Sequence, residues 1–470
     1  MPAGRRPWAG RGPAPGPGAN HRPGNAAAGP EPTADAGPDR RPIRARTDRG
    51  GSAGYSGGMQ IVKDSKRALK LAKRVLKGRR AYFELKTLLA ERGELPEQRF
   101  RVGVYFADSD VNIYQMRQWY APLQELAKTR PVVVLARNAA GALQLMRESG
   151  LEVAFVPKVT SIENFIATQQ LDVILYVNQN TRNFQMMRYG ERWHVFINHG
   201  ESDKMYMTSN QYKTYDYAFI AGDAARARLT KALWNYDVDS RAIAIGRPQT
   251  DHLGGEPAYT PDDRTVVFYA PTWEGDRPAA SYGSVLTHGV TLVRELLATG
   301  RHRVVYRPHP RSGVVSPEFG AANAQIIAML EAANQADSAA QHVYDQSPVL
   351  GWQLRTPDVA ICDISAMVYD RLATGRPLMV TRPLAEEAEV DEAGYLSVCE
   401  WLTAEQAENI VAELDRVIGD TAARARLGEW STRYFGDTSP GAPTARFQTA
   451  IETLLGKADA ERAAAGTDAL

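Results

Sequence analysis

Short runs of β-branched and aromatic residues alternate with helix-length segments from about residue 100 onward, and this alternation limits the possible folds most. Strands separated by helices pair in parallel, and a parallel sheet is covered by helices on both faces. The sequence therefore predicts an α/β fold. The first series of predicted strands comprises residues 101–106, 132–135, 153–156, 173–177, 194–197, 217–220 and 242–245, and the second comprises 266–269, 304–306, 359–362 and 378–380.

A polar stretch rich in Pro and Asp, residues 256–264, separates the two series of predicted strands. At 470 residues the chain is long enough for two domains with appendages. We therefore expect two Rossmann-like lobes facing a cleft and joined near residues 246–260. The expected boundaries are 96–250 for the first lobe, 251–456 for the second and 457–470 for a tail. Ligands of such sheets bind beyond the carboxyl ends of the strands.

The N-terminal part of the chain differs sharply in composition from the rest. Gly and Pro fill 23 of the first 58 positions, so residues 1–58 are expected to be a disordered tail. Residues 59–92 hold eleven Lys and Arg against three acidic residues. Within 59–95, Leu69, Ala72 and Leu76 recur at helical spacing among cations, which predicts a basic amphipathic helix. Such a helix either binds an anionic membrane surface through residues 59–92 or packs on the first lobe.

The number of cysteines and the hydropathy of the chain indicate in which cellular compartment the protein is expected. The two cysteines, Cys362 and Cys399, are too few for a disulfide framework, and Cys362 lies in an apolar run typical of a buried thiol. No run approaches the roughly 18 apolar residues that span a bilayer, and the N-terminus lacks the apolar stretch of a secretory signal. We expect a cytoplasmic protein, peripheral at the inner face of the plasma membrane.

The strand predicted at 194–197 runs into Asn198, His199 and Gly200. An imidazole with a pKa near 6.5 can take a proton from a hydroxyl nucleophile, and a glycine permits the tight turn that exposes it. The alternative is a histidine that is hydrogen-bonded within a domain interface. His199 is therefore a candidate catalytic base.

The strand predicted at 266–269 runs into a loop that contains Thr272 and Trp273. The hydroxyl and the loop amides are suited to phosphate oxygens, although Thr and Trp after a strand also serve as turn and packing residues. On this pattern alone, both interpretations stay open.

The strand predicted at 304–306 is followed by Arg307-Pro308-His309-Pro310. In extended backbone, Arg307 and His309 point to the same side, and the prolines stiffen the loop. A guanidinium and an imidazole together suit a diphosphate. The alternative is a structural cap on a neighbouring carboxylate.

The most informative pattern follows the strand predicted at 359–362. That strand ends at Asp363, Ser365 is a good helix N-cap, and Asp370 shares a helix face with Ala366. Backbone N–H groups at a helix start attract anions, and Asp370 is suited to a donor hydroxyl. The plainer interpretation is that any βαβ unit has this pattern.

In this order and spacing, these motifs resemble the CDP-glycerol glycerophosphotransferase family of teichoic-acid polymerases and primases. The resemblance covers about residues 195–385 and includes a hinge, Gly246 to Asp251. The chain departs from the family pattern at Asn198 (usually Trp), Gln249 (usually Arg) and Ala366 (usually Ser). The departure at Ala366 bears on the group that the donor carries.

The resemblance implies a GT-B-like fold with an N-terminal acceptor lobe and a C-terminal donor lobe. It also implies transfer of glycerol phosphate from CDP-glycerol to a lipid-linked or polymer acceptor, with release of CMP and with side-chain cations in place of a metal or other cofactor. His199 and His309 are the implied catalytic residues. The implied donor and phosphate ligands are Thr272, Arg307, Asp363, Ser365, Ala366 and Asp370, with Asn198, Gly200 and Trp273 as further candidates.

Three other functions are compatible with parts of the sequence. A sugar-nucleotide glycosyltransferase of the same architecture would release UDP or GDP instead of CMP. A membrane-associated scaffold with a vestigial site is supported by Asn198 and Ala366, but the joint presence of His199, Arg307 and Asp370 argues against it. Binding of nucleic acid is not expected, because no aromatic-interleaved patch accompanies the basic segment.

Overall fold

The computed structural model describes residues 76–200, 208–347, 350–390 and 394–467. All of them belong to one unit, which begins at Arg67. The predictions for residues 1–58 and for 59–75, which include Leu69 and Ala72, lie outside the described residues. No helix in the described part of the chain is long and apolar enough to cross a membrane.

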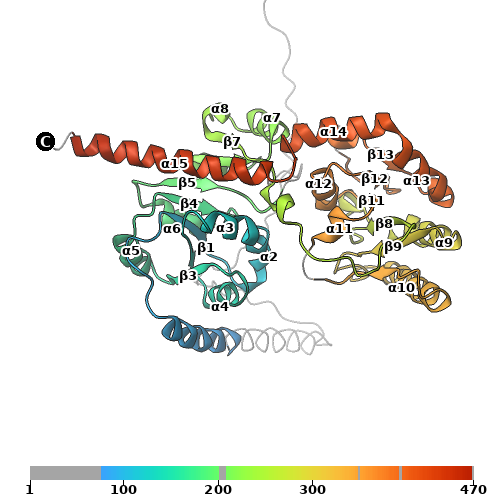
Figure 1. The fold of residues 1–470 in the computed structure, drawn as a ribbon, viewed down its shortest axis with the longest axis horizontal. Coiled ribbons are helices and arrows are strands. Elements are labelled where there is room, and N and C mark those ends of the chain that lie inside the picture. Colours follow the sequence, from blue (N-terminus) through green and yellow to red (C-terminus); the bar gives the residue numbers. More distant parts are fainter. Residues whose placement is uncertain (1–75, 201–207, 348–349, 391–393, 468–470) are drawn as a thin grey trace, which may run out of the picture. The chain divides into compact units, whose positions relative to one another are not determined.

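The first lobe is built on a parallel sheet of seven strands within the described residues (Figure 1). Its order is β3-β2-β1-β4-β5-β6-β7, so the order reverses between β1 and β4. Such a reversal opens a crevice at the carboxyl ends of the two strands. The strands are β1 (Val102–Phe106), β2 (Val132–Ala136), β3 (Glu152–Phe155), β4 (Val173–Tyr176), β5 (Trp193–Phe196), β6 (Tyr217–Ile220) and β7 (Ala242–Ala244).

The second lobe repeats this plan with six strands among the described residues, in the order β10-β9-β8-β11-β12-β13. The order reverses between β8 and β11, and all pairings are parallel. The strands are β8 (Thr265–Ala270), β9 (His302–Tyr306), β10 (Val343–Tyr344), β11 (Val359–Cys362), β12 (Leu378–Thr381) and β13 (Glu400–Leu402). The two Rossmann-like lobes predicted from the sequence are confirmed.

Helices cover both faces of each sheet, because successive strand residues point to opposite faces. In β1, Val104 and Phe106 enter one buried cluster and Tyr105 enters the other. In β8, Phe268 packs in the buried cluster on one face of the second sheet, and Tyr269 packs in the cluster on the other face. The helices are α2 (Ile113–Arg117), α3 (Tyr120–Ala127), α4 (Ala139–Glu148), α5 (Val159–Thr168), α6 (Phe184–Met187), α7 (Asp223–Ala232), α8 (Val238–Arg241), α9 (Val290–Ala298), α10 (Pro317–Ala336), α11 (Trp352–Arg355), α12 (Ala366–Leu372), α13 (Ile410–Gly419), α14 (Thr421–Phe435) and α15 (Ala442–Thr467).

Two strands of the second lobe, β10 and β13, were not predicted. β10 has two residues, and β13 reads Glu-Trp-Leu, so neither forms an apolar run. Both lie at the edges of the sheet, where one side of the strand pairs with no other strand among the described residues. Edge strands need less apolar character than central strands, which explains why the pattern of runs missed them.

The last helix, α15, corrects the predicted domain boundaries. We expected the second lobe to end at residue 456 and a tail to follow, but α15 runs unbroken from Ala442 to Thr467. Its Phe447 packs on Trp119 and Phe219 of the first lobe, with ring centroids 5.4 and 6.2 Å apart. The C-terminal helix, drawn in red in Figure 1, therefore completes the core of the first lobe.

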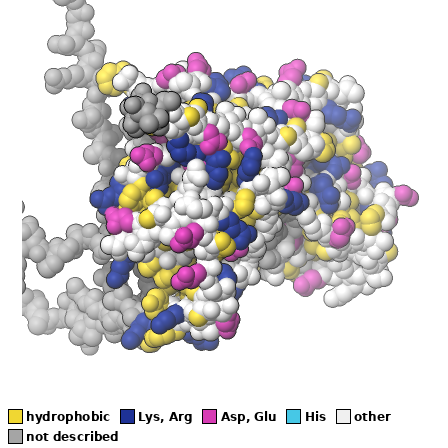
Figure 2. All heavy atoms as spheres, turned by 60° about the vertical axis from the view of Figure 1, so that its left-hand side comes forward, with side chains coloured by type: hydrophobic (Ala, Val, Ile, Leu, Met, Phe, Trp, Pro, Cys, Tyr) yellow, Lys and Arg dark blue, Asp and Glu magenta, His cyan; other side chains and the backbone are white. Residues whose placement is uncertain are grey.

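The basic segment forms a helix over its described part, residues 76–92. Ala81 and Leu85 are buried in the core of the first lobe, which matches the packing alternative. The opposite face of the helix carries Leu76 and Phe83, which are 66% and 63% exposed. Figure 2 shows hydrophobic and basic side chains close together at the lower end of this face of the molecule.

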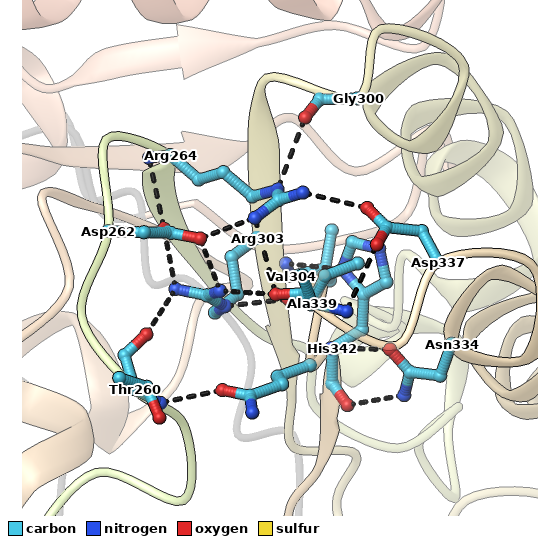
Figure 3. Close-up of polar contacts among 12 residues, drawn as sticks. Thr260, Asp262, Arg264, Gly300, Arg303, Val304, Asn334, Asp337, Ala339 and His342 are labelled. Carbon is cyan, nitrogen blue, oxygen red and sulfur yellow. Dashed lines mark hydrogen bonds and ion pairs between the residues drawn. The ribbon is translucent and has the colours of Figure 1, made fainter.

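The linker into the second lobe is held by a buried arginine, Arg303, at the start of β9 (Figure 3). Its guanidinium donates to both carboxylate oxygens of Asp262, at 2.9 and 2.8 Å, and to the carbonyl oxygen of Thr260. Arg264 donates to Asp337 and joins the same network. These contacts lie at the amino end of β9, away from the carboxyl edge where the predicted site residues cluster, so we assign them to anchoring the linker.

Candidate active site

The predicted site residues follow strands that are neighbours in the two sheets. In the second lobe, β8 pairs with β9 on one side and β11 on the other, so the loops that carry Thr272, Arg307 and Asp363 leave the same edge. In the first lobe, His199 follows β5, which pairs with β4. The predicted site residues therefore lie at the carboxyl ends of parallel strands, at and beside the points where strand order reverses.

His199 is held in one tautomer by the end of β4. Its Nδ1 lies 3.0 Å from the carbonyl oxygen of Val177. A carbonyl only accepts, so Nδ1 carries the proton and Nε2 carries the lone pair. Burial lowers the pKa of His199, and the nearby charge of Arg247 lowers it further. The imidazole is therefore neutral at pH 7 and able to accept a proton through Nε2.

The tight turn at this loop is made by Asn198, not by Gly200. Asn198 has a φ of +54°, in the left-handed region that Asn tolerates better than most residues. Its side chain closes the turn by accepting from the N–H of His199 and donating to the carbonyl of Gly200. The carbonyl of Asn198 accepts from the indole of Trp119. Gly200 has no positive φ, and a Cβ built on it meets no described atom within 4 Å.

His309 has the opposite tautomer. Its Nδ1 accepts from the backbone N–H of Arg311 at 3.1 Å, so the neutral ring carries its proton on Nε2 and donates from there. The ring stacks on Trp273, with centroids 6.3 Å apart and an interplanar angle of 28°. The guanidinium of Arg311 also lies over Trp273, at 3.7 Å from the ring centroid. Trp273 therefore orients His309.

Glu274 joins this loop to the loop after β9. Its carboxylate accepts from the backbone N–H groups of Gly313, Val315 and Ser316 at 2.7–3.0 Å. Burial opposes ionisation of Glu274, but the three donors hold its pKa below the ordinary value. Sequence reasoning assigned no role to Glu274. It couples the Trp273 loop to the His309 loop at the start of α10.

Asp363 is buried and does not line the large cavity, which argues against its predicted role as a donor ligand. Its side chain is fully buried, and it accepts from the N–H groups of Thr272 and Ser284 and from the hydroxyl of Thr381. Burial raises the pKa of Asp363 to about 6. The residue therefore ties β8, β11 and β12 together beneath the site, and Thr272 uses its backbone N–H for this contact.

The start of α12 agrees with the prediction in part. Ser365 is the N-cap, as predicted, and its hydroxyl accepts from the N–H of Met367. Ala366 is exposed at the first helical position. The helix has seven residues and ends at Leu372, so its dipole is weak. Asp370 lies on α12 and forms an ion pair with Arg247 of the hinge.

A cavity of about 470 Å³ lies between residues of the first lobe, the hinge and the second lobe. Arg307 and Asp370 line it together, whereas His309 and Thr272 are absent from its lining. Tyr114 also lines it and packs edge-on against His199, with ring centroids 6.0 Å apart. Asn198 and Gly200 line a smaller cavity of about 40 Å³.

Every arginine that lines the large cavity has a carboxylate partner. Arg117 donates to Glu148 through two nitrogens, at 2.8 and 2.9 Å. Arg307 pairs with Asp345 and also donates to the carbonyl and hydroxyl of Ser347. Arg247 pairs with Asp370. The Arg307 contact agrees with the alternative of a structural cap on a carboxylate, although its side chain stays 22% exposed to the cavity.

Arg247 was not among the predicted site residues. The hinge pattern consists of Gly246, Pro248 and Asp251, and the position of Arg247 within it is not part of the pattern. Arg247 and Gln249 both line the large and the small cavity, so the hinge borders both. Among the described residues, no group of three His, Cys, Asp or Glu side chains is arranged to hold a metal ion.

No family model and no curated protein matches the sequence. Solved structures do match. The wall teichoic acid polymerase TagF aligns with 85% of this chain and 98% of its own, at 13% identity and a TM-score of 0.50. A putative UDP-N-acetylglucosamine 2-epimerase from Listeria monocytogenes aligns with 76% of this chain and 97% of its own, at 12% identity and a TM-score of 0.49. A glycosyltransferase from Rickettsia africae aligns with 76% of this chain and 99% of its own, at 10% identity and a TM-score of 0.46. The similarity to TagF shows the fold, which is GT-B-like, as predicted.

Proposed function

We propose that this chain is a transferase that moves glycerol phosphate from CDP-glycerol to a hydroxyl of a membrane-linked, teichoic-acid-like or cell-wall glycopolymer and releases CMP. The observation that carries the proposal is the state of His199. Its proton is held on Nδ1 by the Val177 carbonyl and its pKa is lowered, so Nε2 is available as a base at neutral pH.

In the proposed reaction, His199 Nε2 takes the proton of the acceptor hydroxyl. The acceptor oxygen forms a bond to the β-phosphorus of the donor. The bond between that phosphorus and the bridging oxygen breaks, and CMP leaves with the electron pair. Because phosphoryl transfer depends mainly on positioning and charge stabilisation, the remaining roles are electrostatic.

The donor diphosphate is proposed to bind near Arg307 and His309. Arg307 is oriented by Asp345 and Ser347, and the neutral ring of His309 carries its proton on Nε2 because its Nδ1 accepts from Arg311. Thr272 and Ser365 stand at the same edge of the sheet and are proposed as further phosphate contacts. Asp363 is left out of this set, because its carboxylate is buried beneath the site.

We also propose that the protein acts as a peripheral enzyme at the cytoplasmic face of the membrane. The inner face of helix 76–92 is used for packing, but its outer face presents Leu76 and Phe83 flanked by the exposed Arg79, Arg80 and Lys86. An exposed apolar stripe between cations fits an anionic lipid surface, where cations and an inserted aromatic ring both contribute to binding.

The proposed function is tested with purified protein, CDP-glycerol and a membrane fraction that supplies the acceptor, with CMP release as the measurement. CDP-ribitol is assayed in parallel to identify the polyol. We expect CMP release to fall by at least about 100-fold in His199→Ala, since a general base contributes about 10²–10⁴ in rate. Wild-type turnover in both His199→Ala and His309→Ala, or release of UDP or GDP from sugar nucleotides in place of CMP, would overturn the proposal.

A further inference from the structure

Arg247 belongs to the hinge, lines a cavity with residues of the first lobe and forms an ion pair with Asp370 of α12. It lies between β7 and β8, and its side chain is only 10% exposed. It lines the small cavity together with Asn198 and Gly200 and the large cavity together with Arg307. Its charge also acts on His199. Arg247 is therefore a cation that borders both the loop of His199 and the second lobe.

The backbone that carries Arg247 is fixed by the end of α14, the start of α15 and the turn between them. Gly246 has a φ of +75°, and a Cβ at this position would lie 2.2 Å from the guanidinium of Arg446 and 2.9 Å from the carbonyl of Phe435. Asp251 accepts from the N–H groups of Gly441 and Thr444 and from the Thr444 hydroxyl. The start of the Arg247 side chain is therefore held in place independently of Asp370.

The guanidinium of Arg247 keeps more donor capacity than the other two arginines of the cavity. Arg117 places two nitrogens on Glu148, and Arg307 makes three hydrogen bonds. Within the described residues, Arg247 has Asp370 as its side-chain partner, reached through one terminal nitrogen at 2.5 Å. A guanidinium has five N–H donors, so Nε and the other terminal nitrogen still have donors for a ligand.

We propose that Arg247 binds the transferring phosphate of a nucleoside-diphosphate donor beside His199, and that Asp370 is a positioning residue that orients its guanidinium. This inference rests on the proposed function, and it replaces the role of donor-hydroxyl ligand first expected for Asp370. Arg247 offsets the charge on the phosphate oxygens while the acceptor proton passes to His199, the new O–P bond forms and CMP departs with its electron pair. A partly buried guanidinium suits this task, because charge interactions strengthen where water is excluded.

In a purely structural role, the ion pair of Arg247 and Asp370 would only hold the hinge against α12. The two roles separate in three variants: Arg247→Gln, Asp370→Asn and, as a control, Arg130→Gln, which removes an exposed arginine paired with Glu452. If the pair is purely structural, Arg247→Gln and Asp370→Asn should weaken ligand binding equally. If Arg247 binds the phosphate and Asp370 only positions it, Arg247→Gln should weaken ligand binding more than Asp370→Asn.

Ligand binding is measured by calorimetry with CDP and, in parallel, with inorganic pyrophosphate. We expect Arg247→Gln to weaken both by about 10- to 100-fold, the range for a lost charge-assisted hydrogen bond, and Asp370→Asn to weaken them less. Failure of CDP to bind the wild type would overturn the donor assignment, while Arg247-dependent pyrophosphate binding would still support this inference. Pyrophosphate binding that is unchanged in Arg247→Gln would overturn it.

Titration of His199 by NMR gives a readout that needs no substrate. Among the described residues, the groups that face this ring are Arg247, Tyr114 and the Val177 carbonyl, and the signal is assigned with His199→Asn. Removing the cation is expected to raise the pKa of His199 in Arg247→Gln, whereas removing its counter-charge in Asp370→Asn is expected to lower it. Shifts in the same direction would contradict the proposed arrangement.

Discussion

At the scale of single residues, the protonation of His199 determines how the proposed activity depends on pH. Burial and Arg247 both lower the pKa of His199 below its usual 6.5, so the neutral base predominates throughout the neutral range. We expect kcat/KM for CDP-glycerol to stay level from pH 7 down past 6.5 and then to fall about tenfold per pH unit as Nε2 becomes protonated. The measurement is CMP release at saturating acceptor across this range. An acid limb that already lies above pH 6.5 would contradict the assignment of His199 as the base.

Asp363 provides a residue-scale prediction about stability. Its folded-state pKa of about 6 exceeds the ordinary 3.8, so the folded protein binds this proton more tightly than the unfolded chain does. The contribution of Asp363 to stability therefore decreases as pH rises from about 4 to 6, by about 3 kcal/mol. In Asp363→Asn, the amide oxygen can accept from Thr272 and Ser284 while the NH₂ group donates to Thr381, so this pH dependence should disappear.

The measurement for Asp363 is urea unfolding of wild type and Asp363→Asn at pH 4 and pH 7. The difference in free energy of unfolding between them should move in favour of the variant by about 3 kcal/mol at the higher pH. Asp363→Ala is the comparison variant, because it leaves two buried N–H groups without an acceptor and should lose about 2–4 kcal/mol. Loss of donor turnover in a stably folded Asp363→Asn would restore the original ligand assignment.

The site residues show what local patterns reveal and what they do not. The positions of His199, Arg307 and Ser365 follow from strand ends and a helix cap, which are local features. The inward orientation of Asp363 depends on Thr381 of a neighbouring strand, and the Arg247–Asp370 pair joins distant parts of the chain. Such contacts arise only from tertiary packing, so a sequence pattern identifies the right strand end without giving the direction of each side chain.

At the scale of elements, helix 76–92 has two apolar faces with different uses. Leu85 on the inner face is 1% exposed, and Phe83 on the outer face is 63% exposed. The sequence pattern indicated one apolar stripe and left two alternatives, membrane binding and packing. The described part of the helix packs through one stripe and leaves another for the proposed membrane contact.

Phe83→Ser therefore tests the membrane proposal without disturbing the packed face. Burying an aromatic side chain contributes about 1.5–3 kcal/mol, so we expect sedimentation with phosphatidylglycerol-containing vesicles to weaken by about tenfold or more. Trp234→Ser is the matched control, because Trp234 is an 86% exposed aromatic residue outside this helix. Equal vesicle binding by wild type and Phe83→Ser would refute the role of this face.

At the scale of the whole molecule, the C-terminal helix makes the first lobe depend on the last part of the chain. The sequence predicted most strands and the two-lobe plan because each βαβ unit is local. It did not predict that α15 returns to the first lobe, since the amphipathic pattern of a helix does not specify which lobe receives its apolar face. The buried partners of Phe447 are Trp119 and Phe219, which belong to the first lobe.

Because α15 packs on the first lobe, we predict that a substitution in this C-terminal helix will destabilise the first lobe. Phe447 is fully buried, and Phe447→Ala should cost about 3–5 kcal/mol through the lost contacts and the cavity left behind. The measurement is amide hydrogen exchange, in which protection should fall in β1, β4 and β5 and change little in β8 and β11. Glu461→Ala, an exposed change on the same helix, serves as the control. Because Trp119 also donates to the carbonyl of Asn198, the same variant should loosen the His199 loop, whereas loss of protection confined to the second lobe would show that α15 belongs there.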